Sequence, residues 1–297
     1  MKKKIILIVN PKAGTLISKT DLISKLEEEA RLEGKGEYAV ETWQTQYRGH
    51  ATELAKKAAL EEIELCIAVG GDGTMNETAC GLVGSETCLG IIPLGSGNGL
   101  ARHIKLSMEP EVAMKQLILG KTKAMDVGQI DGKYFFLSAG IGFEGTVAKH
   151  FSQQKTRGFT QYLKSAAKAL LHYKPIRVAL KTSAKNTDEL IFTLNFSNGS
   201  QYGNNAIIAP GASLYDGLLD ITRIAPFPFW KGPELAFRLL TNALEDGKYV
   251  VRSVENSFEV NLEKETEGHR DGESIILPKS FTVSILAEKL KIREPFD

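Results

Sequence analysis

The sequence predicts two domains: an α/β domain with a parallel sheet over residues 1–125, and a mostly β, sandwich-like domain over residues 126–286. The chain of 297 residues is long enough for two domains of ordinary size. Up to residue 125, strand-like runs alternate with helix-like segments, as in a parallel sheet covered by helices. Beyond it, short β-like runs recur between Gly, Pro, Asn and Asp, as in a sandwich or barrel.

The first domain is predicted from short apolar runs, typical of buried strands, and from apolar residues at helical spacing. The expected strands are Ile5–Val9, Tyr38–Gln46, Leu65–Val69 and Cys88–Ile92. The expected helices are Ser18–Leu32, His50–Leu60, one that starts near Met75, and Glu109–Leu119.

The second domain is predicted from many short β-like runs and two helical segments. The expected strands are Tyr134–Ser138, Ile176–Thr182, Glu189–Ser197, Ala206–Ala209, Leu218–Ile224, Ser257–Leu262, Ser274–Leu277 and Phe281–Leu286. The expected helices are Thr160–His172 and Gly232–Glu245. Regular turn signals between such runs favour an antiparallel sandwich.

Composition excludes several classes of protein. A net charge of +1 lacks the basic excess of nucleic-acid-binding proteins. No run approaches the roughly 18 apolar residues of a membrane span, and the apolar run after Lys2–Lys4 is too short for a signal peptide. Cys66 and Cys88 lie inside apolar runs and are expected to be buried thiols, which favours a reducing cytoplasm.

Small-residue loops follow three of the expected strands. They are Asn10–Gly14, Gly70–Glu77 and Pro93–Gly99. The carboxyl ends of parallel strands meet at one edge of a sheet, and glycines there leave backbone N–H groups bare for an anion. Thr74 or Asn76 is expected to cap the following helix, whose positive end also favours phosphate. Tight strand–helix turns without a ligand are the alternative.

Asp72 is the unexpected residue of these loops. Phosphates repel a carboxylate unless a cation intervenes or the carboxylate takes a proton from an acceptor. Asp72 therefore indicates Mg²⁺-assisted phosphoryl transfer. The loops match neither the G-x-x-x-x-G-K-[ST] pattern of P-loop enzymes nor the G-x-G-x-x-G dinucleotide fingerprint.

Two Asp-Gly pairs stand out in the second domain. Asp271 and Glu273 flank Gly272, and in an extended segment their side chains share a face, which suits a division between a metal or water ligand and a proton acceptor. A plain hairpin turn is the alternative. Asp216-Gly217 carries the same ambiguity.

Taken together, the Gly70–Thr74, Pro93–Asn98 and Asp271–Glu273 segments resemble the diacylglycerol kinase catalytic family, which includes bacterial lipid kinases and sphingosine kinases. The resemblance covers essentially the whole chain in order, including Asn198–Ser200 and Pro210–Ala212. It implies an ATP-dependent lipid kinase of phospholipid metabolism, with the active site in the cleft between the domains. It also implies that a tail of about residues 287–297 returns to the first domain.

The resemblance also implies the roles of individual residues. The implied ATP-binding residues are Asn10, Pro11, Lys12, Ala13, Gly14, Thr45, Gly70, Gly71, Asp72, Gly73, Thr74, Met75, Asn76 and Ser96. Glu273 is implied as the proton acceptor with Asp271 beside it, and Asp72 as the third catalytic residue. A Mg²⁺ site is implied at the Asp216 carboxylate and the carbonyl oxygens of Ser213 and Leu218. Whether this ion is structural or catalytic stays open, as does the choice of base between Asp271 and Glu273.

Two positions leave the identity of the lipid substrate undecided. Diacylglycerol is the first expectation, but Gly99 and Glu144 resemble the sphingosine-kinase form, in which an acid can meet a lipid amine. A sphingoid base is therefore the second. NAD kinases share the Asp72 loop, and a non-catalytic nucleotide or lipid sensor of the same fold is the remaining alternative.

A basic stretch without Asp or Glu runs from Gly145 to Thr187. Its basic residues are Lys149, Lys155, Arg157, Lys164, Lys168, Lys174, Arg177, Lys181 and Lys185. With interleaved aromatic residues and the Pro226–Trp230 loop, it predicts peripheral contact with an anionic membrane surface. A solvated helix face and a packed loop are the alternative. A homo-oligomer is compatible with the sequence.

Overall fold

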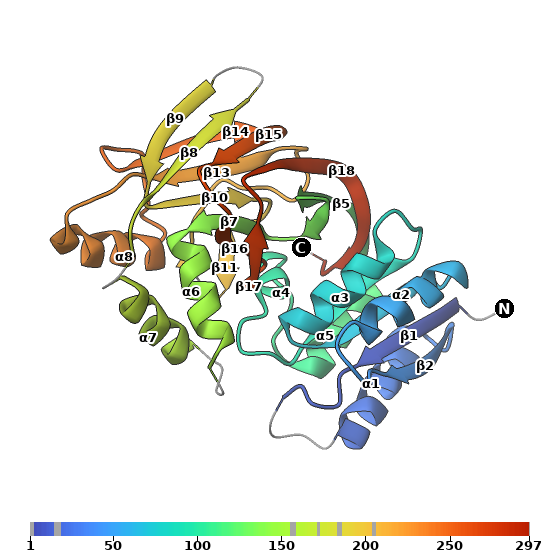
Figure 1. The fold of residues 1–297 in the computed structure, drawn as a ribbon. Helices are drawn as coiled ribbons and strands as arrows, with labels where there is room; N and C mark the ends of the chain where they lie inside the picture. The colour runs from blue at the N-terminus through green and yellow to red at the C-terminus, as the bar shows by residue number, and fades with distance from the viewer. Residues whose placement is uncertain are drawn as a thin grey trace. The chain divides into compact units, whose positions relative to one another are not determined.

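The computed structural model describes residues 3–14, 19–154, 159–170, 173–182, 186–203 and 206–296. The chain divides into two compact units (Figure 1). Unit 1 comprises Met1–Met125 and Glu288–Asp297, and unit 2 comprises Asp126–Ala287. The predicted fold class is confirmed: unit 1 is an α/β domain with a parallel sheet, and unit 2 is built mainly from antiparallel sheets.

Unit 1 contains a parallel sheet in the order β2-β1-β3-β4. Its strands are β1 (Lys3–Val9), β2 (Tyr38–Gln44), β3 (Leu65–Gly70) and β4 (Cys88–Pro93). The far end of β18 (Ser280–Glu294) adds a further parallel strand beside β4, with Ile292 opposite Leu89. Strands β3 and β4 are buried along their whole length, which explains their uninterrupted apolar runs.

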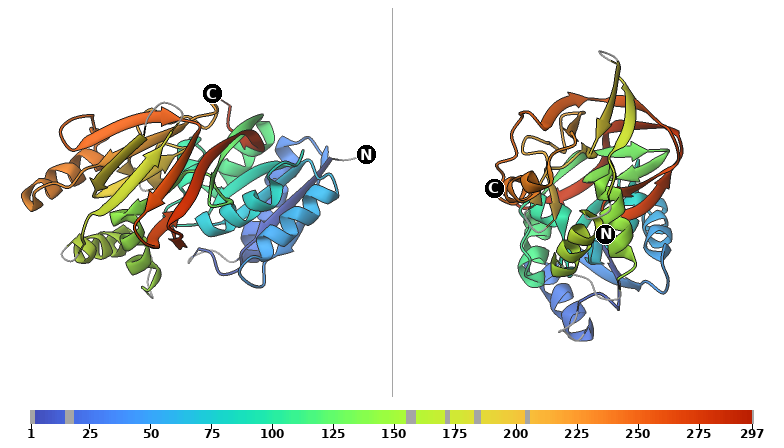
Figure 2. Two further views of the ribbon diagram at one scale, coloured as in Figure 1. Left: turned by 45° about the horizontal axis from the view of Figure 1, so that its top comes forward. Right: turned by 60° about the vertical axis from the view of Figure 1, so that its left-hand side comes forward.

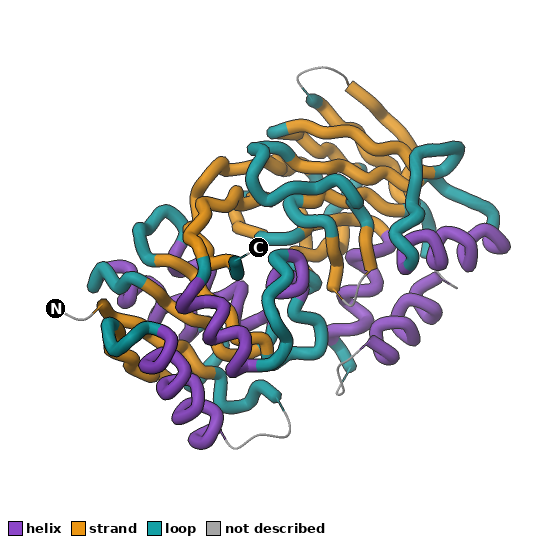
Figure 3. Tube along the Cα trace, turned by 180° about the vertical axis from the view of Figure 1, so that it is seen from behind, coloured by secondary structure: helices purple, strands orange, loops and turns teal. Residues whose placement is uncertain are grey.

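Helices cover this sheet (Figure 3). They are α1 (Lys19–Glu33), α2 (His50–Leu60), α3 (Asp72–Leu82), α4 (Gly99–His103) and α5 (Pro110–Leu119). Helix α2 lies against α3, and α1 lies against α5. Right-handed crossovers in this strand order place the two pairs on opposite faces of the sheet.

Unit 2 is a sandwich of antiparallel sheets. One sheet has the order β14-β13-β10-β7-β16-β17. Its strands are β7 (Ser138–Gly142), β10 (Thr193–Ser197), β13 (Leu219–Ile224), β14 (Val250–Glu255), β16 (Thr266–Arg270) and β17 (Glu273–Leu277). All the pairings between neighbours in this sheet are antiparallel.

The second layer of the sandwich joins β9, β8, β15 and the first part of β18. The remaining strands of the unit are the second half of β5 (Lys121–Ile130), which begins in unit 1, and β6 (Lys133–Phe135), β8 (Ile176–Lys181), β9 (Asn186–Ile191), β11 (Gln201–Gly203), β12 (Ala206–Ile207) and β15 (Ser257–Leu262). Apolar side chains from both layers form one core, in which the rings of Phe196 and Phe258 lie 5.4 Å apart.

Helical segments of unit 2 follow strands of the first sheet or lie at its margin. They are α6 (Phe143–Ser152), α7 (Phe159–Leu170), the short 3-10 turn η1 (Phe229–Lys231) and α8 (Gly232–Leu240). Among the described residues, no helix combines the length and apolar character needed to cross a membrane.

Several sequence expectations for unit 2 are wrong in detail. The expected strand Glu189–Ser197 is two strands, because the chain passes from one sheet to the other at Phe192. The expected strand Tyr134–Ser138 falls across β6 and the start of β7. Helix α6 and strands β14 and β16 were not expected. The expected helix ends at Ser18 and His172 lie outside the described residues.

Candidate active site

The three small-residue loops of unit 1 follow β1, β3 and β4, at the carboxyl ends of adjacent parallel strands. The loop after β1 is tied to α3, since Asn10 Nδ2 donates a hydrogen bond of 3.2 Å to Thr74 Oγ1. The Asn10 side chain also shapes its own loop, because Oδ1 accepts a 2.9 Å bond from the Lys12 N–H. Thr45 joins the same edge by donating its backbone N–H to the Val9 carbonyl.

Asp72 ties the loop after β3 to the loop after β4. Its Oδ2 accepts a 2.9 Å bond from the Asn98 N–H, and its Oδ1 accepts a 2.8 Å bond from the Gly99 N–H. Asp72 is half-buried and is the first residue of α3, where the helix dipole favours a negative charge. Asp72 therefore joins the loop after β3 to the loop after β4.

Asn98 closes the loop after β4 and was not among the predicted site residues. Its φ of 52° is left-handed, and its side chain bonds to Gly95 twice, accepting from the N–H at 3.0 Å and donating to the carbonyl at 2.7 Å. An asparagine within a run of glycines is typical of such a left-handed turn. This pattern was the sequence signal that could have found Asn98.

The expected helix cap at Thr74 or Asn76 is wrong. Helix α3 begins at Asp72 with Gly71 as its N-cap, because the Asp72 carboxylate is held by the next loop and starts the first turn. Thr74 and Met75 are buried, so their side chains face the protein. Other predicted ATP-binding residues are exposed around the loops, namely Pro11, Lys12, Gly14, Gly73 and Ser96. Two more are half-buried, namely Ala13 and Asn76.

Asp271 and Gly272 are the two central residues of a tight hairpin turn between β16 and β17. Both have positive φ, 46° and 80°, and Arg270 pairs with Glu273 across the turn. The segment is not extended, so the predicted shared face of Asp271 and Glu273 is wrong. An Asp-Gly pair adopts this turn readily because both residues tolerate left-handed backbone.

The Asp271 carboxylate is used inside unit 2. Its oxygens accept bonds from the N–H groups of Phe136, Leu137 and Ser138, at 2.8, 2.8 and 3.1 Å. Burial raises the pKa of Asp271 above its usual value, although these three bonds oppose the rise. Glu273, by contrast, is exposed at the first position of β17. Asp271 thus fastens the turn that presents Glu273.

The Ser213–Leu218 segment forms an oxygen-rich turn. Asp216 Oδ1 accepts a 3.0 Å bond from the Leu218 N–H, and Ser213 Oγ accepts one from the Tyr215 N–H at 3.2 Å. The buried Asp126 braces this turn, since its Oδ2 accepts a 2.7 Å bond from the Gly217 N–H.

This turn fits a hard cation by its donor chemistry. Burial and the negative charge of Asp216 both raise the pKa of Asp220, so the two carboxyls repel one another. A cation beside Asp216 would relieve that repulsion, and carboxylate and carbonyl oxygens are the ligands Mg²⁺ prefers. No cluster of three His, Cys, Asp or Glu side chains suited to a metal occurs within the described ranges, so carbonyl oxygens would have to complete the site.

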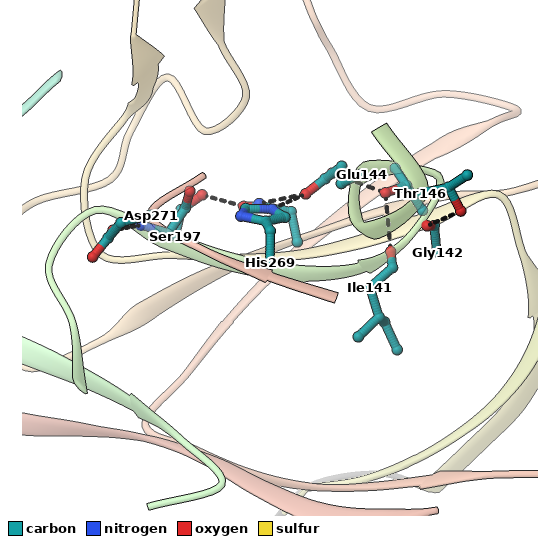
Figure 4. Close-up of polar contacts among 10 residues, drawn as sticks. Ile141, Gly142, Glu144, Thr146, Ser197, His269 and Asp271 are labelled. Atoms are coloured by element: carbon teal, nitrogen blue, oxygen red, sulfur yellow. Dashed lines mark hydrogen bonds and ion pairs between the residues drawn. The ribbon is translucent and has the colours of Figure 1, made fainter. Parts of the chain in front are cut away.

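A buried polar cluster lies on the first sheet of unit 2 (Figure 4). Glu144, from the first turn of α6, accepts hydrogen bonds from Thr193 and Asn195 of β10 and contacts His269 of β16. His269 is itself buried. The Glu144 carboxylate is committed to these partners, and nothing in the sequence pattern linked it to them.

A parallel α/β unit with joined glycine loops, followed by an antiparallel sandwich, suits a lipid kinase, and comparisons with known proteins agree. Residues 4–130 match the diacylglycerol kinase catalytic domain, and residues 138–292 match the YegS C-terminal NAD kinase beta sandwich-like domain. The chain belongs to the diacylglycerol kinase family and is a lipid kinase.

Individual relatives support this assignment. The chain is 30% identical to a diacylglycerol kinase of Bacillus subtilis, covering 91% of this chain and 90% of the relative. It is 29% identical to a "Probable lipid kinase YegS-like" protein of Klebsiella pneumoniae, covering 86% of this chain and 85% of the relative. A solved diacylglycerol kinase structure from Bacillus anthracis shares the fold, with a TM-score of 0.77 at 21% identity over 98% of this chain and 97% of that chain.

Proposed function

We propose that this lipid kinase transfers the γ-phosphoryl group of ATP to a primary hydroxyl of diacylglycerol with the help of Mg²⁺. The observation that carries the proposal is the joining of three glycine-containing loops in unit 1, by Asn10 to Thr74 and by Asp72 to Asn98 and Gly99. Loops held in this way present backbone N–H groups in fixed positions, which is what binding of a polyphosphate requires.

Glu273 is the proposed proton acceptor. It is exposed at the end of the hairpin turn, whereas both oxygens of Asp271 already accept backbone N–H groups. A positioned base accelerates attack by a lipid hydroxyl by roughly 10²–10⁴-fold. Asp271 therefore supports the turn, and Glu273 receives the proton.

The metal ion is proposed to lie at the Asp216 turn, held by the Asp216 carboxylate and the carbonyl oxygens of Ser213 and Leu218. When bound, Mg²⁺ supplies positive charge that offsets negative charge on phosphates. The chain itself contributes Asp126, which holds the Gly217 N–H and so fixes the shape of the turn.

Diacylglycerol is preferred over a sphingoid base because of Glu144. An acid that meets a lipid amine must be accessible, but Glu144 is buried and bound to Thr193, Asn195 and His269. Its carboxylate is therefore occupied by donors from the protein.

The test is phosphorylation of a panel of lipid alcohols by labelled ATP and Mg²⁺. We expect labelled phosphatidic acid from diacylglycerol and at least tenfold less product from sphingosine. Asp72→Asn and Glu273→Gln should each lower turnover by roughly 100-fold or more, whereas the exposed Glu263→Gln should leave it unchanged. Preferential labelling of sphingosine would contradict the proposed substrate.

Peripheral contact with an anionic membrane surface is the second part of the proposal. Helix α7 exposes Lys164 and Lys168, and η1 and α8 expose Phe229, Trp230 and Phe237 by 66%, 76% and 66%. The backbone of these helices can be followed by colour in Figure 2, with α7 in yellow-green and α8 in orange. The two helices are neighbours, because a Cβ on Gly232 would lie 3.8 Å from the Leu170 side chain. Exposed basic and aromatic side chains on neighbouring helices suit an anionic lipid interface.

Other basic residues of this stretch are engaged elsewhere. Lys149 pairs with Glu267, Arg177 with Asp188 and Lys181 with Glu259. Lys155, Arg157 and Lys185 lie outside the described residues. We therefore propose that α7, η1 and α8 make the membrane contact. A homo-oligomer, also compatible with the sequence, remains a prediction.

Co-sedimentation with vesicles tests the membrane contact. Binding should be stronger to anionic than to neutral vesicles, should weaken at high salt, and should fall on Trp230→Ser or Lys164→Glu. Leu60→Ser is the matched control, since Leu60 is 87% exposed on α2 in unit 1. Equal binding to both kinds of vesicle would count against the proposal.

A further inference from the structure

The buried cluster around Glu144 is built on three neighbouring strands. Gly140 of β7 lies opposite Asn195 of β10 on one side and opposite His269 of β16 on the other. The Glu144 carboxylate lies over the glycine between these two side chains. The cluster therefore joins α6, β10 and β16 at one point of the sheet.

Each partner of the cluster is buried and within hydrogen-bonding distance. Glu144 Oε1 accepts from Thr193 Oγ1 at 2.8 Å, and Oε2 accepts from Asn195 Nδ2 at 3.0 Å and lies 2.7 Å from His269 Nε2. The four residues are between 0% and 8% exposed. Buried polar groups with matched partners specify one arrangement more than they add stability.

Gly140 shows how closely the cluster is fitted. A Cβ at this position would lie 2.3 Å from Glu144 Oε2 and 2.9 Å from His269 Nε2. At the next point of contact, a Cβ on Gly145 would lie 2.2 Å from the Glu267 carbonyl oxygen, so α6 rests directly on β16. Small residues thus allow the first turn of α6 to reach the strand that carries His269.

The same strand leads into the turn that presents Glu273. His269 is two residues before Asp271, and Asp271 binds the N–H groups at the entrance of β7. Strand β16 is consequently fixed to β7 at the turn by Asp271, and to α6 and β10 by the Glu144–His269 contact. Both attachments lie within four residues of Glu273.

We propose that Glu144 and His269 are positioning residues that hold the β16–β17 hairpin, and with it Glu273, in the orientation needed for proton transfer. The inference rests on the proposed role of Glu273 as the base. A misplacement of about 1 Å in a reacting group lowers a rate by roughly 100-fold, so a rigid support matters.

The first test measures the rigidity of the hairpin and does not depend on an enzyme assay. Hydrogen–deuterium exchange of the peptide that contains Arg270–Glu273 is compared among wild type, Glu144→Gln and the control Glu267→Gln. Glu144→Gln keeps the shape but turns an amide N–H₂ toward donors, whereas Glu267→Gln breaks the Lys149 pair that joins the same helix and strand at the surface. Exchange should rise at least tenfold in Glu144→Gln alone.

The second test separates positioning from general destabilisation. Glu144→Gln should lower kcat for diacylglycerol by roughly 10- to 100-fold, with the KM for ATP within about twofold of wild type. His269→Leu should behave alike, and His269→Gln, which restores an N–H donor toward Glu144, should recover most of the loss.

Different results would contradict the positioning role and the proposed function. Unchanged hairpin exchange in folded Glu144→Gln, or equal kcat in His269→Leu and His269→Gln, would overturn the positioning role. A wild-type protein without diacylglycerol kinase turnover would instead overturn the proposed function. The exchange measurement would then still decide whether Glu144 fixes the turn.

Discussion

At the scale of single residues, the loop glycines of unit 1 serve the packing of two loops. A Cβ on Gly95 would lie 2.7 Å from the Gly71 Cα, and a Cβ on Gly97 would lie 2.7 Å from Asp72 Oδ2. Neither distance leaves room for a methyl group. The sequence predicts that the glycines of these loops bind phosphate, and the structure adds that Gly95 and Gly97 let Asp72 reach the neighbouring loop.

This close approach predicts different effects for two glycines of the candidate site. Gly95→Ala should destabilise the protein by about 1–3 kcal/mol, because the added methyl group overpacks against Gly71. Gly73→Ala should be neutral or stabilising by up to about 1 kcal/mol, since nothing lies within 4 Å and the residue is in a helix. Urea unfolding measures both. Equal losses of stability would contradict the packing account.

Asp220 predicts a dependence of stability on pH. Burial and then Asp216 raise its pKa in the folded protein above the usual value of 3.8. Its contribution to stability is therefore complete below the unfolded pKa and is lost as pH rises through the folded pKa. Replacing Asp220 by Asn should therefore raise the free energy of unfolding relative to wild type, and the increase should be larger at pH 7 than at pH 3.

Urea unfolding of wild type and Asp220→Asn across this pH range checks the sign. Asp131→Asn, in the exposed turn between β5 and β6, is the control and should follow wild type throughout. A stability difference that does not vary with pH would show that Asp220 acts other than through its charge.

Single residues were singled out from the sequence more readily than their partners. Asp72 stood out as a carboxylate among glycines, but its acceptance of the Asn98 and Gly99 N–H groups depends on two loops meeting in space. For Asp271 the hairpin turn was the alternative to the predicted extended segment, and its bonds to Phe136 and Leu137 join positions more than 130 residues apart. Spacing along a chain carries no information on such pairs.

At the scale of elements, strands buried on both faces were predicted best. The expected strands at Ile5–Val9, Leu65–Val69 and Cys88–Ile92 correspond to β1, β3 and β4, because a covered parallel sheet demands unbroken apolar runs. Helix α6 was missed because its N-cap is Gly142, with a positive φ of 90°, and because its first turn carries a buried acid, Glu144. A buried polar residue interrupts the spacing of apolar residues by which a helix is predicted from sequence.

Strand β18 provides a test at this scale. A chain ending at Ala287 loses Leu290 and Ile292, which are fully buried, and the pairs of Lys291 with Glu86 and Lys123 with Glu294. It also exposes the edge of β4. We expect a lower melting temperature and aggregation on heating, measured by circular dichroism and light scattering. A control chain that lacks only Asp297 should resemble the full chain.

At the scale of the whole molecule, the two units use different means to bury their strands. Unit 1 covers a parallel sheet with helices, and unit 2 packs antiparallel layers on one another. Both architectures could be predicted because their periodicities differ along the sequence. The polar cluster of Glu144 and His269 could not be, since it depends on how strands are ordered in a sheet.

The buried thiol of Cys66 can report whether the sheet of unit 1 unfolds locally or only with the whole protein. It lies fully buried in β3, and burial raises its pKa to about 12, so little thiolate forms at neutral pH. Native protein at pH 8 should resist a thiol reagent at Cys66, and labelling should follow the global unfolding curve in urea. Peptide mass mapping measures the site. Rapid labelling without denaturant would show that the sheet opens locally.

The division of the chain also has a bearing on synthesis. Unit 1 is discontinuous, since residues Glu288 onward belong to it while Asp126–Ala287 form unit 2. Translation of the intervening segment takes on the order of ten seconds. Throughout that interval the nascent amino-terminal sheet lacks the strand that covers Leu89 of β4. Unit 1 can therefore be completed only after all of unit 2 has been synthesised, and until then chaperones would have an unpaired sheet edge to shield.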